Sequence, residues 1–141
     1  MNSGGALCGM PKSCMDKNWI LADFESAIEQ LDSALAEPAA KDIIKAGCIQ
    51  YFEFSFELAW KSIKVVSGSL GQADCLSPKG CLKQGFTNGW INSEEIWLEM
   101  LQARNAMSHT YNARHALKIY ASLGRFLPEL KSLLKKLKSA T

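Results

Sequence analysis

The sequence has no long apolar run and few of the residues that assemble metal or redox sites. Its 141 residues contain no stretch of roughly 18 uncharged apolar residues, the length a membrane-spanning helix needs. The first fifteen residues lack the basic and apolar regions of a secretion signal. Neither Cys-x5-Cys pair has the spacing of a zinc site. We therefore expect a cytoplasmic protein without a metal or cofactor, whose five cysteines are reduced and mostly structural.

The chain also has little excess of charge of either sign, because its net charge is only +2. A balance this small does not by itself imply nucleic-acid binding. The charges are segregated, however, and residues 112–141 carry seven basic side chains and a single acid, Glu129. This basic end is either a solvated helix face or a surface for an acidic partner, nucleic acid or nucleotide.

Apolar residues recur at helical spacing along most of the chain, which predicts an all-α protein. Residues 1–15 contain three glycines and a proline without any period, so we expect a flexible tail. Residues 16–141 then form one helical-bundle domain, beginning with a helix that Asp16 can cap and that Pro38 ends. Segment 41–70 is apolar nearly all the way round, so it is expected to lie at the centre of the bundle.

The polar residues of segment 41–70 form one narrow stripe of Gln50, Glu53, Glu57, Lys61 and Lys64. The stripe either faces solvent, with Glu57 and Lys61 paired one turn apart, or lines a cleft or partner surface. Two carboxylates one turn apart suit acid and base roles only if burial separates their pKa values, which a sequence does not show.

Local signals predict the boundaries of the remaining helices. Ser77-Pro78 is a cap and first-turn pair for a short helix through residue 86, and Ser93 caps a helix that runs to about residue 109. Asn112 caps the final helix. Pro128, which follows Gly124, predicts a kink or a split near residues 124–127.

Residues 101–113 contain the strongest candidate site. On a helix Asn105 and His109 share one face, Arg104 and Ser108 form the neighbouring row, and Tyr111 follows at the helix end. An imidazole can exchange a proton near neutral pH, and a guanidinium can hold a phosphate with two hydrogen bonds. Such a set suits phosphate chemistry without a metal.

A structural role explains the same residues. Arg104 can cap the helix end or pair with Glu57, while His109 and Tyr111 hold the helix junction. His115 has no matching companions, so we expect it on the surface.

Arg104-x4-His109-x-Tyr111, with Asn105 directly after the arginine, resembles the signature of the HEPN superfamily. Residues 51–61, YFEFSFELAWK, are similar to the second helix of its branch called nucleotidyltransferase substrate-binding proteins. The resemblance covers about residues 17–138. It implies an up-and-down bundle of four to five helices that forms a homodimer and is encoded near a minimal nucleotidyltransferase.

The resemblance implies two functions. In the first, the chain is a binding subunit that presents a nucleotide, an RNA end or Tyr111 itself to the partner transferase, with Glu53, Glu57, Lys61, Asn105 and Ser108 as binding residues. In the second, it is a metal-independent ribonuclease toxin in which Arg104 and His109 are catalytic. AMP transfer to Tyr111 would silence such a toxin, as in a toxin–antitoxin pair.

Overall fold

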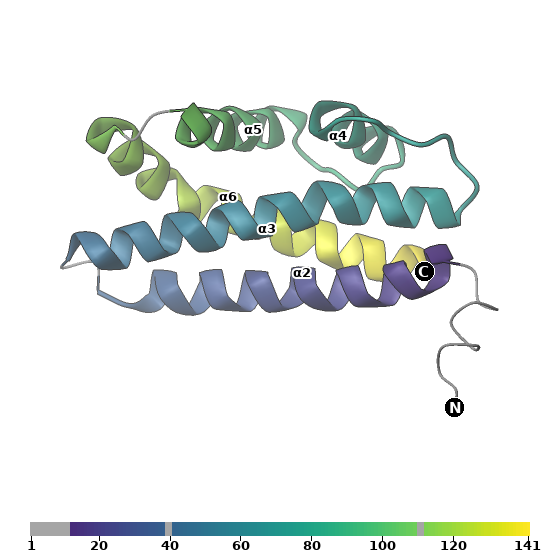
Figure 1. The fold of residues 1–141 in the computed structure, drawn as a ribbon, viewed down its shortest axis with the longest axis horizontal. Coiled ribbons are helices and arrows are strands. Elements are labelled where there is room, and N and C mark those ends of the chain that lie inside the picture. The colour runs from purple at the N-terminus through teal and green to yellow at the C-terminus, as the bar shows by residue number, and fades with distance from the viewer. Residues whose placement is uncertain (1–11, 39–40, 110–111) are drawn as a thin grey trace.

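The computed structural model describes residues 12–38, 41–109 and 112–141, and within these ranges the chain forms five helices (Figure 1). They are α2 (Lys12–Ala36), α3 (Asp42–Ser69), α4 (Pro78–Thr87), α5 (Glu94–His109) and α6 (Ala113–Ala140). Helices α2 and α3 are antiparallel, the segment with α4 and α5 leads back along α3, and α6 returns (Figure 1). The predicted up-and-down arrangement is confirmed.

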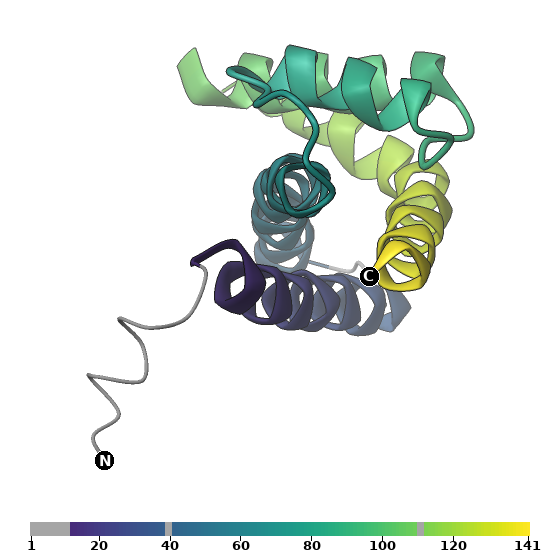
Figure 2. The same cartoon turned by 90° about the vertical axis from the view of Figure 1, so that its right-hand side faces the viewer.

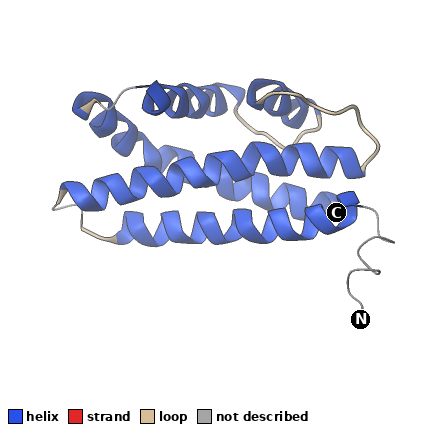
Figure 3. Cartoon of the chain, in the orientation of Figure 1, coloured by secondary structure: helices blue, strands red, loops and turns tan. Residues whose placement is uncertain are grey.

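Helix α3 lies at the centre of the bundle, as its all-round apolar pattern predicts. It packs against α2, α4, α5 and α6. Figure 2 shows α2 on one side of α3 and the α4–α5 layer on the other, with α6 closing the remaining side. Every described residue is in a helix or a loop, which confirms the all-α class (Figure 3).

Side-chain caps set the helix boundaries where the sequence predicts them. The Ser77 hydroxyl accepts a hydrogen bond from the backbone N–H of Gly80 at 3.0 Å, and α4 begins at the following proline. The Ser93 hydroxyl accepts one from the N–H of Ile96 at 3.3 Å. Asn112 accepts two at the start of α6, which satisfies amides that the first helical turn leaves unbonded.

Two boundaries differ from the expectation. Helix α2 begins at Lys12, so four residues of the segment expected to be a tail are helical, and Asp16 lies inside the helix rather than at its cap. Helix α6 stays unbroken across Pro128, so the alternative of a split is wrong. Its two halves nevertheless point in different directions in Figures 1 and 2. Proline removes the donor to the Gly124 carbonyl, which allows a bend without ending the helix.

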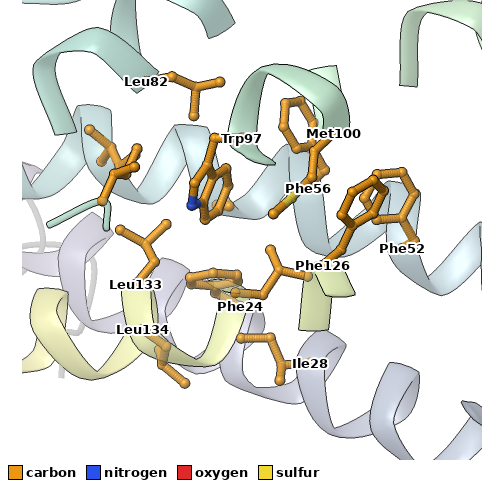
Figure 4. Packing of buried hydrophobic residues seen from close by; sticks show 14 of the residues in the cluster. Phe24, Ile28, Phe52, Phe56, Leu82, Trp97, Met100, Phe126, Leu133 and Leu134 are labelled. Atoms are coloured by element: carbon orange, nitrogen blue, oxygen red, sulfur yellow. The ribbon is translucent and has the colours of Figure 1, made fainter. Parts of the chain in front are cut away.

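Aromatic rings from four helices meet in the core (Figure 4). The ring centroids of Phe52 and Phe126 are 5.3 Å apart, and those of Phe56 and Trp97 are 6.3 Å apart. Phe24 of α2 is completely buried beside them. Burial of each ring stabilises the folded state by about 1.5–3 kcal/mol, so this cluster fixes α3 and α5 against each other.

Cys75 and Cys81 form a disulfide, which corrects the expectation of reduced thiols for this pair. The loop between α3 and α4 folds back so that their Cα atoms are 5.1 Å apart. Lys64 holds the loop by donating to the Asp74 carboxylate at 2.7 Å and to the Cys75 carbonyl at 2.6 Å. Cys48 is a free, buried thiol, as expected of a structural cysteine, and burial raises its pKa.

None of the helices in the described part of the chain combines the length and the apolar character that crossing a bilayer requires.

Candidate functional site

The candidate site is built where the polar stripe of α3 faces the second half of α5. The Arg104 Nε atom of α5 lies 2.7 Å from the Glu57 Oε2 atom of α3. The two side chains are 29% and 31% exposed, so this ion pair is partly shielded from solvent. Glu57 therefore pairs with Arg104, as the structural alternative proposed, and not with Lys61 one turn along its own helix.

Both members of the ion pair have a second partner that fixes their orientation. The Trp60 indole Nε1 donates a hydrogen bond to Glu57 Oε1 at 3.2 Å, and Arg104 Nη1 donates one to the Asn105 side-chain oxygen at 3.1 Å. The sequence interpretation assigned no role to Trp60. Its position three residues after Glu57 on the same helix is the signal that predicts this contact.

Glu53 lies one turn before Glu57 on α3 and is half-buried. Burial raises the pKa of its carboxyl above the ordinary value of 4.5, which the neighbouring Arg104 charge opposes and the Glu57 charge reinforces. The two carboxylates thus occupy different environments. Glu57 is held in an ion pair, whereas Glu53 has a pKa displaced towards neutrality.

The rest of the polar stripe does not join this group. The Lys61 ammonium lies 5.7 Å from the centre of the Trp60 ring and lines a groove between α2 and α3 together with Trp19 and Lys64. Lys64 binds the loop that carries Asp74. The stripe therefore divides into a carboxylate half that faces α5 and a lysine half that faces away from it.

Three of the predicted site residues fall partly or wholly outside the described part of the chain. Helix α5 ends at His109, as predicted. The side chains of Ser108 and His109 lie outside the described residues, and so does the whole of Tyr111. His115 is exposed in the first turn of α6, which agrees with the expected surface position.

The described groups favour binding of a charged or hydrogen-bonding ligand. Arg104 is positioned by Glu57 and Asn105, so it presents its charge in a fixed direction. A phosphate at this position would have to compete with the Glu57 carboxylate.

Comparison with known proteins identifies the family of the chain. The family model described as nucleotidyltransferase substrate binding protein like matches residues 20–139. A Haemophilus influenzae protein named "Probable ribonuclease HepT" is 31% identical over 131 residues, which is 87% of this chain and 78% of the relative. The fold and the motif define a helical bundle of the HEPN class. Within that class, the chain belongs to the HepT-like family of nucleotidyltransferase substrate-binding proteins.

Solved structures share the fold. One is HI0074 of Haemophilus influenzae, whose structure is described as revealing the fold of a substrate binding domain of a nucleotidyltransferase. It is 27% identical to this chain with a TM-score of 0.73, and the match covers 84% of this chain and 98% of HI0074. A tri-AMPylated Shewanella oneidensis HEPN toxin in complex with MNT antitoxin is 13% identical with a TM-score of 0.71, over 92% of this chain and 99% of the toxin. The second likeness concerns the fold alone.

Proposed function

We propose that this chain is the substrate-binding subunit of a two-component system whose other component is a minimal nucleotidyltransferase. The observation that carries the proposal is the Glu57–Arg104 ion pair within the fold of this family. An arginine that already faces a carboxylate attracts phosphate less strongly than an unneutralised one. Weak attraction of this kind suits reversible holding of a phosphate-bearing substrate better than the strong stabilisation of charge on phosphorus that RNA cleavage requires.

Tyr111 is the proposed acceptor of AMP from the transferase. In the sequence it falls between His109, where α5 ends, and Asn112, which caps α6. The Shewanella oneidensis HEPN toxin with the same fold carries AMP groups in its complex with MNT antitoxin. The same end of the bundle would also receive a nucleotide or an RNA end.

The subunit is proposed to act as a homodimer. Large apolar side chains on α3 are exposed, with Ile43 at 76% and Phe54 at 50%. Exposed apolar surface of this kind on a central helix is typical of an interface between protein chains. A second copy would cover it and bring two motifs into one assembly.

Coexpression with the transferase encoded nearby tests the proposal. We expect the two proteins to elute together from a sizing column, and the chain to gain the mass of an AMP group in the presence of ATP. Tyr111→Phe should abolish the gain, while the matched control Tyr120→Phe should retain it. Independent elution at micromolar concentration would contradict the partnership.

A ribonuclease toxin is the second candidate, supported by the complete Arg104-x4-His109 motif and by the name of the Haemophilus influenzae relative. In this function His109 exchanges a proton with the ribose hydroxyl or the leaving oxygen, and Arg104 stabilises the charge on phosphorus. Expression would then arrest growth, and His109→Ala would relieve the arrest whereas His115→Ala would not. RNA cleavage that persists undiminished in His109→Ala would exclude this assignment.

A further inference from the structure

A cavity of about 340 Å³ lies beside the candidate site, between the first half of α3, the end of α5 and the start of α6. This volume is within the range of about 300–1,000 Å³ that small-molecule pockets occupy. Of the residues that line it, only Gln50 and Glu53 belong to the polar stripe of α3.

Apolar side chains line much of the cavity. Ile49 of α3 is buried, Met107 of α5 and Ala116 of α6 are half-buried, and Leu117 of α6 is exposed. Three different helices therefore supply apolar surface around one space. Such surfaces suit a flat ring, which buries both of its faces on binding.

The polar groups of the cavity follow α3 in order: Asp42, Lys45, Gln50 and Glu53. Hydrogen-bond acceptors predominate, because two of the four are carboxylates and the glutamine amide adds another oxygen. Lys45 is the one cation among these four, and its ammonium lies 5.8 Å from the centre of the Tyr120 ring. This lining favours a ligand that carries N–H donors on its edge.

The cavity also continues the candidate site along α3. It ends at Glu53, and the Arg104 ion pair begins at Glu57, four residues or about 6 Å further along the helix. A ligand with a ring in the cavity would reach Arg104 along the α3 surface, where its phosphate would compete with the Glu57 carboxylate.

We propose that this cavity binds the nucleobase of the nucleotide or RNA end presented at Arg104, and that it selects a base with an exocyclic amino group. Guanine fits best because it presents two adjacent N–H donors, which match the two oxygens of a carboxylate, and a carbonyl acceptor for a lysine. Gln50 and Glu53 are one turn apart and provide the acceptors, while Ile49 and Met107 contact the ring faces. Uracil, which has only one N–H donor, fits poorly.

The part of this inference that places a phosphate at Arg104 rests on the proposed function. Its test uses nucleosides, which carry no phosphate, and leaves out the transferase. Calorimetric titration of the full chain should show guanosine binding about tenfold more tightly than uridine, the effect of one hydrogen bond to a charged group. Glu53→Gln and Gln50→Leu should each reduce this preference. Equal affinity for the two nucleosides, or no binding of either at millimolar concentration, would overturn the proposal.

A blocking variant provides the structural control. Ala46 lines the cavity and is exposed, so Ala46→Trp can fill the space without entering the core. Ala22→Trp places the same side chain on an exposed position of α2 that does not line the cavity. Guanosine affinity should fall in the first variant alone, with both melting like the parent protein. Unchanged affinity in Ala46→Trp would contradict the proposal.

The two proposals fail in different ways. A chain that binds the transferase but discriminates no nucleoside would refute the base pocket and leave the subunit function intact. A chain that binds guanosine through the cavity but never associates with the transferase would refute the subunit function and retain the pocket.

Discussion

Glu57 of α3 and Arg104 of α5 form an ion pair of 2.7 Å across the interface between these two helices. The two residues are far apart in the sequence. The core rings of Phe56 and Trp97 hold α3 and α5 in the register that brings them together. The pair both stabilises the bundle and lowers the local positive charge of the motif.

Glu57→Gln should therefore weaken the fold and strengthen anion binding. Loss of a partly shielded ion pair should lower the free energy of unfolding by about 1 kcal/mol, measured by urea denaturation at neutral pH. The variant should also bind a short single-stranded RNA more tightly than the parent, because Arg104 loses its carboxylate partner. Glu95→Gln removes an exposed acid from the same pair of helices and is the control. Equal behaviour of the two variants would contradict a special role for Glu57.

Glu53 predicts a pH dependence of stability. Its pKa in the folded protein is raised above the ordinary value of 4.5, chiefly by burial, so the folded state binds a proton at this site more tightly than the unfolded chain does. Stability from this residue is lost as the pH rises from below 4.5 through the raised pKa. Glu53→Gln does not ionise, so its stability relative to the parent should increase over the same interval. Urea unfolding of both proteins at a series of pH values measures the difference, and a constant difference would contradict it.

The Cys75–Cys81 disulfide should stabilise the chain by constraining its unfolded state. The bridge closes a loop with a sequence separation of 6 residues, for which the chain-entropy estimate is about 2 kcal/mol. Addition of a thiol reductant should lower the urea concentration at the midpoint of unfolding, by the amount that this loss of free energy predicts. The double variant Cys75→Ser/Cys81→Ser should start at the lower midpoint and should not respond to reductant. If the double variant still responded to reductant, the reductant would be acting at a bond other than Cys75–Cys81, which would contradict the prediction.

Phe54→Asp tests the proposed homodimer. Placing a charge on the exposed apolar surface of α3 should convert the dimer to a monomer, since the interface would bury an unpaired carboxylate. Sedimentation velocity at micromolar concentration gives the mass directly. Leu76→Asp is the control, because Leu76 is 88% exposed in the α3–α4 loop rather than on α3. A parent protein that sediments as a monomer would contradict the dimer itself.

Sequence patterns predicted the features that depend on local chemistry. Ser77, Ser93 and Asn112 each cap a helix within three residues of themselves, so the information for those boundaries is contained in a single turn. The central position of α3 followed from its all-round apolar pattern, and the family resemblance is confirmed by the match over residues 20–139.

Features that depend on distant segments were harder to predict. The choice of Arg104 over Lys61 as the partner of Glu57 is made by the packing of α5 on α3, which periodicity does not specify. The proximity of Cys75 and Cys81 depends on the path of a loop. The cavity beside Glu53 requires the junction of three helices, so spacing along one helix could indicate its polar residues but not its apolar walls.

The second half of α6 is tied to α2 in antiparallel fashion, with Lys131 bound to Asp32 at 2.7 Å and Lys138 bound to Glu25 at 2.8 Å. The leucines at 130, 133 and 137 are buried on the same half of the helix. During synthesis, α2 and α3 leave the ribosome long before these residues exist, so their facing apolar surfaces remain uncovered. The nascent chain therefore cannot complete its core until about residue 138 has emerged, and until then the facing apolar surfaces of α2 and α3 remain accessible to chaperones.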